Sequence, residues 1–271
     1  MSPQPPNMTQ PILQTQGLAK SFLGLQALQD FTITVNANEI LGLIGPNGAG
    51  KTTCFNLLTG FLVPTAGKIH FKGANITGMS PAQIARLGLA RTFQNIRVFS
   101  SLSVLENVMA AAQLRMRFTL GELLLSTPGF RRKEDQAMAR SHELLNLLDL
   151  SEYADRPAAS LPYAHQRRLE IARALATEPQ LLLLDEPAAG MNPAESDSLH
   201  QLILDLRSRF NLTILLVEHD MRLVMNLCER IIVLNYGKVI AEGKPEAVRA
   251  NPQVIAAYLG EDHSEIEASH A

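Results

Sequence analysis

Residues 41–53, which read LGLIGPNGAGKTT, have the types and the spacing needed to bind a phosphate group. Within them, residues 45–52 fit the G-x-x-x-x-G-K-[ST] pattern of a P-loop. Glycines let successive backbone N–H groups wrap around a phosphate, Lys51 adds a positive charge, and the Thr52 hydroxyl can reach Mg²⁺. The alternative is a glycine-rich connection without a ligand. We predict a nucleotide site made of Gly45, Pro46, Asn47, Gly48, Ala49, Gly50, Lys51, Thr52 and Thr53.

Two adjacent carboxylates, Asp185 and Glu186, follow an apolar run at residues 181–184. A P-loop alone binds a nucleotide without hydrolysing it, because hydrolysis also needs a metal ligand and a group that activates water. Asp185 can hold Mg²⁺ directly or through water, and Glu186 can act as the general base. Solvated acids at a strand end are the structural alternative. The pair therefore predicts hydrolysis of the bound nucleotide.

Two further polar residues could complete this site. His219 follows another apolar run, residues 213–217, and strand ends on one edge of a parallel sheet converge near the ligand. His219 could bond the γ-phosphate or orient the base, whereas Gln94 could reach the metal and the attacking water. Alone, either residue would be interpreted as structural. We predict catalytic roles for Glu186, His219 and Gln94, and a Mg²⁺ site of Thr52, Gln94 and Asp185.

The elements that must position these residues indicate an α/β protein. A strand at residues 40–44 precedes the P-loop and a helix follows it, which is the context that the motif requires. Apolar and polar residues alternate in short runs over residues 12–35, which favours an antiparallel β section. In residues 102–150, apolar residues recur with helical periodicity. The predicted fold class is therefore an α/β P-loop NTPase (RecA-like) core with an antiparallel β section and an inserted α-helical subdomain.

The same patterns divide the chain into four parts. Residues 1–11 are predicted to form a disordered lead-in, and the acidic residues 260–271 a disordered tail. Residues 12–94 and 164–259 are predicted to form the nucleotide-binding core. Residues 95–163 are predicted to form the inserted helical subdomain.

Composition limits the partners and the cellular location. A net charge of −2 provides no overall attraction to nucleic acid, so no nucleic-acid partner is predicted. Cys54 and Cys228 lie far apart and are expected to be reduced, buried thiols, as in the cytosol. No apolar run approaches the ~20 residues that span a bilayer, and the N-terminus lacks the features of a signal peptide. We expect a soluble protein, which could still dock on a membrane partner.

In chain order, five motifs resemble those of the nucleotide-binding subunits of ABC transporters. They are GPNGAGKT, Gln94, LPYAHQRRLEIARAL at residues 161–175, LLLLDEP and EHD, and the resemblance covers about residues 12–259. The segments TPGFRRKE, DEPAAGMNP and NPQVIAAYLGE resemble the subfamily that powers importers of branched-chain amino acids. The resemblance implies ATP and Mg²⁺ as cofactors and ATP hydrolysis coupled to transport. It also implies that Phe22 stacks on the adenine ring, the alternative being a core phenylalanine.

The resemblance further implies partners. One is a second ATP-binding subunit, the same or different, in a head-to-tail dimer that holds each ATP between one P-loop and the other subunit's signature segment. The others are integral-membrane permease subunits and, indirectly, a solute-binding protein. The implied location is peripheral, on the cytoplasmic side of the inner membrane.

The signature segment departs from the common L-S-G-G-Q pattern. It comprises Leu161, Pro162, Tyr163, Ala164, His165 and Gln166. Pro162 offers no hydrogen-bond donor, and Ala164 could crowd a phosphate or require a left-handed backbone that alanine resists. Ala164 and His165 are the less expected departures, so one alternative to import is a nucleotide-loaded regulatory partner with weak turnover. A separate alternative is a non-transport ABC-type ATPase. Asn192 is expected to cap a helix or to serve subunit communication, and the basic residues 115–133 to form a solvated face or to lie near lipid.

Overall fold

The computed structural model describes residues 11–115 and 128–258. Most of the expected lead-in, the acidic tail and much of the basic segment at 115–133 lie outside these ranges. The chain divides into two compact units, Met1–Pro81 with Ile203–Ala271, and Ala82–Leu202. The expected helical insert, residues 95–163, falls within the second unit, and its limits stay a prediction.

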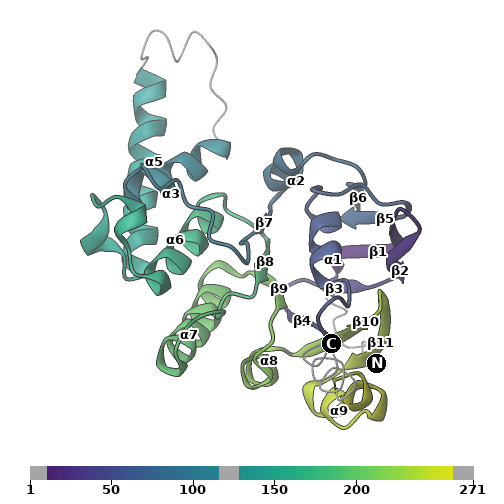
Figure 1. Cartoon of the computed structure of the whole chain (residues 1–271). Coiled ribbons are helices and arrows are strands. Elements are labelled where there is room, and N and C mark those ends of the chain that lie inside the picture. Colours follow the sequence, from purple (N-terminus) through teal and green to yellow (C-terminus); the bar gives the residue numbers. More distant parts are fainter. Residues whose placement is uncertain (1–10, 116–127, 259–271) are drawn as a thin grey trace, which may run out of the picture. The chain divides into compact units, whose positions relative to one another are not determined.

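The first unit contains an antiparallel sheet, as the alternating pattern predicted (Figure 1). Its strand order is β2-β1-β5-β6, and β3 pairs with β1 beside this path. Apolar side chains such as Leu13, Leu18 and Phe71 are buried in it. The strands are β1 (Pro11–Phe22), β2 (Leu25–Phe31), β3 (Thr34–Asn36), β5 (Ala66–Phe71) and β6 (Ala74–Asn75).

The same unit contains the strand that leads into the P-loop. This strand, β4 (Ile40–Ile44), lies between β9 (Thr213–Val217) and β10 (Arg230–Asn235) and is parallel to both. All five residues of β4 and of β9 are buried, as expected for strands covered on both faces. Strand β11 (Lys238–Gly243) closes a hairpin with β10. The helices of this unit include α1 (Lys51–Leu58), α8 (Met221–Leu227) and α9 (Pro245–Arg249).

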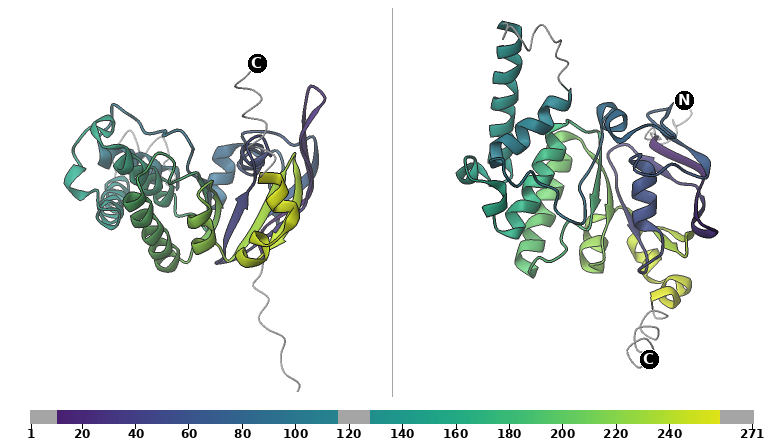
Figure 2. Two further views of the ribbon diagram at one scale, coloured as in Figure 1. Left: turned by 60° about the horizontal axis from the view of Figure 1, so that its bottom comes forward. Right: turned by 45° about the horizontal axis from the view of Figure 1, so that its top comes forward.

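The second unit contains a short parallel strand pair and several helices. Strand β7 (Leu89–Arg91) is parallel to β8 (Leu181–Asp185), so both strands end at the same edge of the pair. Helices α3 and α6, teal to green in Figures 1 and 2, pack against each other and against α5. The elements are α2 (Pro81–Leu87), α3 (Val104–Ala112), η1 (Gln113–Arg115), α5 (Pro128–Leu147), η2 (Ser151–Tyr153), η3 (Ala158–Ser160), α6 (Tyr163–Ala176) and α7 (Pro193–Phe210), of which α7 continues into the first unit.

Local chemistry accounts for where α3 starts. Ser103 and Glu106 form a reciprocal capping box at its N-terminus. The fully buried Asn107 amide donates to the carbonyls of Phe99 and Ser103, and its oxygen accepts from the Phe99 N–H. A buried polar side chain with these partners fixes the chain that enters the helix.

Both cysteines are free and buried, which confirms the expected state of their side chains. Burial raises the pKa of Cys228 to about 12, with smaller contributions from the charges of Glu229 and Glu218. Among the described residues, we find no helix whose length and hydropathy would let it cross a bilayer.

The packing around β4 leaves no room for a side chain at Gly42. A Cβ there would lie 2.9 Å from Cys228 Sγ and 3.5 Å from Val224 Cγ1. We expect Gly42→Ala to lower the free energy of unfolding by about 1 to 3 kcal/mol through overpacking, measured by urea denaturation. The matched control is Gly243→Ala, whose Cβ would meet its nearest atom at 3.7 Å.

A double-mutant cycle assigns the cause of this loss. In a Cys228→Ala background, which removes the closest atom, Gly42→Ala should cost clearly less than in the native chain. An equal cost in both backgrounds, or an equal cost for the control, would contradict the packing explanation.

Candidate functional site

The P-loop of the first unit is a compact turn between β4 and α1. Helix α1 begins at Lys51, directly after Gly50, so its N-terminal N–H groups and the positive end of its dipole face the loop. Lys51 is only 7 % exposed, and its Nζ donates to the carbonyls of Gly45 at 2.5 Å and Pro46 at 2.8 Å. The ammonium group is thereby held across the loop that a phosphate would enter.

Two glycines of this loop are required by close backbone approaches. Gly45 has a φ of 151°, and a Cβ there would lie 2.0 Å from the Leu234 carbonyl oxygen. Gly50 has a φ of 107°, and a Cβ there would lie 2.5 Å from the Ala27 carbonyl oxygen. No other residue type fits either position without movement of the backbone. The loop therefore has the form of a phosphate cradle, with its glycines at the positions that the motif indicates.

Two more predicted site residues lie in the first unit. Phe22 ends β1 and is 41 % exposed, so the alternative of a core phenylalanine is wrong. Its ring lies 5.1 Å from the Lys20 ammonium nitrogen. His219 follows the buried strand β9 and is exposed, and its backbone N–H donates to the Glu218 carboxylate at 3.1 Å. Both side chains are accessible to a ligand.

In the second unit, Asp185 is held by a partner that sequence reasoning missed. Asp185 ends β8, and its Oδ2 lies 2.7 Å from Nη2 of Arg91 on the neighbouring strand β7. The two side chains are 4 % and 5 % exposed. Because a buried carboxylate without a partner costs several kcal/mol, Arg91 fixes both the place and the orientation of Asp185. The available signal was a charged residue at the end of an apolar strand, three positions before Gln94.

Glu186, the predicted general base, has an unusual backbone. Its φ is 48°, in the left-handed region that costs a non-glycine residue roughly 1–2 kcal/mol. The Gln94 amide Nε2 donates to its carboxylate oxygen Oε2 at 2.8 Å, although 92 positions separate the two residues. The structure thus brings together two of the three predicted catalytic residues.

The signature segment adopts a helical start that the sequence did not predict. Helix α6 begins at Tyr163, inside the segment, with Pro162 as its N-cap. Ala164 is therefore helical, and the left-handed backbone that we considered for it does not occur. The Gln166 side chain donates to the Leu161 carbonyl at 2.9 Å, whereas no side chain of the described residues caps the first N–H groups of α6.

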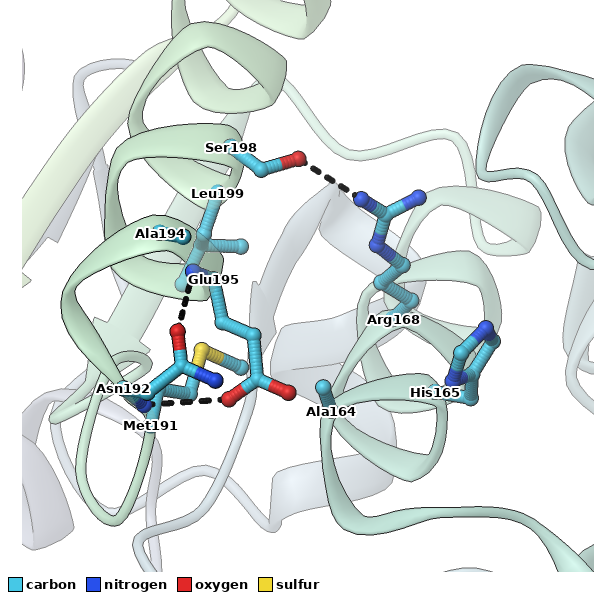
Figure 3. Close-up of a pocket in the computed structure, with 9 residues that line it drawn as sticks. All are labelled: Ala164, His165, Arg168, Met191, Asn192, Ala194, Glu195, Ser198 and Leu199. Carbon is cyan, nitrogen blue, oxygen red and sulfur yellow. Dashed lines mark hydrogen bonds between the residues drawn. The ribbon is translucent and has the colours of Figure 1, made fainter.

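Ala164 and His165 line a pocket of about 320 Å³ between the N-terminal ends of α6 and α7 (Figure 3). On the α7 side, Asn192 Oδ1 accepts from the Glu195 N–H and Glu195 Oε2 accepts from the Asn192 N–H, both at 3.0 Å. The capping role predicted for Asn192 is therefore confirmed, and its role in subunit communication stays a prediction. The ring of His165 lies 4.9 Å from that of Tyr153.

A second arginine that sequence reasoning missed joins α6 to the chain around Gln94. Arg167, 3 % exposed, donates to the carbonyls of Phe93 and Gln94, to the Tyr163 hydroxyl at 3.0 Å and to Glu170 at 3.0 Å. Burial raises the pKa of Glu170, although the Arg97 N–H and the charges of Arg167 and Arg173 act in the opposite direction. The Arg-x-x-Glu spacing on a helix was the only sequence signal for this pair.

The predicted site residues are thus divided between the units. The P-loop, Phe22 and His219 belong to the first, whereas Gln94, Asp185, Glu186 and the signature segment belong to the second. Across residues 11–115 and 128–258, no group of three or more His, Cys, Asp and Glu side chains could hold a metal by itself. The residues predicted to hold Mg²⁺, Thr52 in the first unit and Gln94 and Asp185 in the second, offer a hydroxyl, an amide and a carboxylate, which are oxygen ligands of the kind that Mg²⁺ takes. Their joint site stays a prediction.

We expect Lys51→Ala to weaken equilibrium binding of a labelled ATP analogue by at least about tenfold, because a charge-assisted bond to phosphate is lost. Lys68→Ala is the control, since Lys68 is an exposed lysine of β5 in the same unit. Unchanged affinity in the Lys51 variant, or an equal loss in the control, would refute the prediction that Lys51 and this loop bind phosphate.

Comparison with known protein families matches residues 28–189 to the family described as ABC transporter. Residues 238–264 match a family described as branched-chain amino acid ATP-binding cassette transporter. The high-affinity branched-chain amino acid transport ATP-binding protein LivG of Escherichia coli (strain K12) is 49 % identical over 94 % of this chain and 100 % of its own. The corresponding protein BraF of Pseudomonas aeruginosa is 48 % identical over the same shares.

Among solved structures, the ADP conformation of the ATP-binding cassette MJ1267 matches with a TM-score of 0.80 and 32 % identity, over 93 % of this chain and 100 % of that one. The cassette cbiO1 of Clostridium perfringens matches with a TM-score of 0.76 and 26 % identity, over 94 % and 97 %. These likenesses confirm the predicted α/β P-loop fold class. The chain belongs to the ABC transporter family, and it is similar to ATP-binding proteins of branched-chain amino acid transport.

Proposed function

We propose that this chain binds and hydrolyses ATP, with Mg²⁺, to power an importer of branched-chain amino acids. Binding of the nucleotide is supported by the cradle, in which the buried Lys51 ammonium donates to the Gly45 and Pro46 carbonyls across the loop. The transport part is supported by full-length likeness to LivG and BraF, whose names state branched-chain amino acid transport.

In this proposal, the chain's own residues bind the nucleotide and activate water. The cradle and Lys51 receive the phosphates, Phe22 stacks on the base, and His219 contacts the γ-phosphate. Thr52, Gln94 and Asp185 would hold Mg²⁺, and the bound ion would neutralise charge on the phosphate oxygens. Glu186 accepts a proton from the attacking water, and Gln94 orients the carboxylate through the bond at 2.8 Å. Arg91 keeps Asp185 in place for its role.

The proposed partners are membrane permease subunits, a second ATP-binding subunit in a head-to-tail dimer and, indirectly, a solute-binding protein. The proposed location is peripheral, on the cytoplasmic side of the inner membrane. The family places such subunits at the membrane. The helical backbone of Ala164 removes one reason for the alternative of a weakly hydrolysing regulatory subunit.

Replacement of the general base tests the enzymatic part. Glu186→Gln keeps the size and the Gln94 contact distance but removes the proton acceptor, so we expect phosphate release to fall by about 100-fold or more. Equilibrium binding of ATP should stay within a factor of about two of the native value, because the cradle is intact.

Glu178→Gln provides a matched control. Glu178 lies in the same unit, is exposed and has the same left-handed φ of 48°. It should release phosphate at the native rate. Normal turnover in Glu186→Gln would remove Glu186 as the base, and loss of binding in that variant would show a structural role instead.

A further inference from the structure

One face of α6 binds the backbone of residues 93–99. Arg167 donates to the carbonyls of Phe93 and Gln94, and Glu170 Oε1 accepts from the Arg97 N–H at 2.8 Å. One turn further, Arg173 donates to the Arg97 carbonyl and lies with its guanidinium 4.6 Å from the Phe99 ring centroid. Side chains spaced by three residues thus hold a loop segment about 70 positions away in the sequence.

A continuous series of hydrogen bonds leads from the start of this helix to the proposed general base. The Tyr163 hydroxyl accepts from Arg167 Nη2 at 3.0 Å, and the same nitrogen donates to the Gln94 carbonyl. The side-chain amide of Gln94 then donates to Glu186 at 2.8 Å. Four residues therefore connect the signature segment with the catalytic carboxylate of the same chain.

Tyr163 also touches the loop that carries Glu186. A Cβ on Gly190 would lie 3.3 Å from Tyr163 Cε1 and 3.6 Å from its hydroxyl oxygen, so the tyrosine ring packs against that glycine. Gly190 has a φ of 78° and lies four positions after Glu186. Tyr163 is nevertheless 44 % exposed at the N-terminus of α6. A change at this helix end therefore reaches the Glu186 loop by direct packing as well as through Arg167.

We propose that Tyr163 and Arg167 are positioning residues for Gln94 and Glu186, and that they transmit changes at the signature segment to hydrolysis in the same chain. The inference rests on the proposed function, in which Glu186 is the base and a partner's nucleotide meets the signature segment. Tyr163 stands where the common signature has a glycine. Its hydroxyl accepts from Arg167, and its ring packs against Gly190. A subunit that senses its partner's nucleotide through Tyr163 adjusts its own general base.

The test is a kinetic double-mutant cycle in the full chain with Tyr163→Phe, Gln94→Ala and both together. Tyr163→Phe removes only the hydroxyl, so the ring still packs on Gly190. We expect kcat for ATP to fall by about threefold to tenfold, with KM and equilibrium nucleotide affinity unchanged. In the Gln94→Ala background, Tyr163→Phe should have no further effect, because both act through the same bond to Glu186.

Tyr153→Phe is the matched control, since it is the same chemical change in the same unit on a ring that faces His165. It should keep kcat within about a factor of two. A native kcat in Tyr163→Phe, or losses that multiply in the double variant, would overturn the proposal.

A readout independent of turnover separates failure of this inference from failure of the proposed function. Hydrogen–deuterium exchange should become faster in residues 93–99 and 186–192 of Tyr163→Phe and stay unchanged in the P-loop. If the native chain hydrolyses no ATP, the proposed function fails, yet this exchange pattern would still support the connection. Native exchange in both segments would overturn the connection itself.

Discussion

The buried guanidinium of Arg167 constrains the catalytic part of the second unit. A charge that is 3 % exposed needs acceptors for its donors, and here the two terminal nitrogens donate to the Phe93 and Gln94 carbonyls, Tyr163 and Glu170, whereas Nε has no partner among the described residues. Because these groups belong to a loop and a helix far apart in the sequence, satisfying the arginine requires one arrangement of both. The Gln94 side chain that contacts Glu186 extends from that fixed backbone.

In the first unit, backbone geometry fixes the conformation of the P-loop. Its cradle exists because Gly45 and Gly50 lie against the Leu234 and Ala27 carbonyls, where a Cβ could not fit, and because Lys51 bonds back onto the loop. Such a preformed anion site loses little entropy when a phosphate binds. The left-handed backbone of Glu186 is instead a local strain, which the surrounding packing maintains.

The strand, loop and helix around the P-loop were predictable because the motif is local and its glycines report backbone geometry directly. Gln94 and Glu186 were assigned compatible roles, and the structure adds their direct bond. The Arg91–Asp185 pair and the bonds of Arg167 to the Phe93 and Gln94 carbonyls were not predictable, since they depend on strand pairing and helix packing across more than 70 positions. The family pattern, with glycines at these positions, favours a loop, whereas α6 already starts at Tyr163 and gives Ala164 a helical backbone.

In the proposed mechanism, the residues around Arg167 hold the Gln94 amide against Glu186. The most direct measurement is the NMR signal of the Gln94 side-chain amide in protein labelled with ¹⁵N-glutamine and assigned by its loss in Gln94→Ala. We predict slowed solvent exchange of this NH₂ group in the native chain, and a shifted, faster-exchanging signal in Tyr163→Phe. If this amide exchanges as fast as those of exposed glutamines, or is unchanged in Tyr163→Phe, the residues around Arg167 do not hold Gln94 against Glu186.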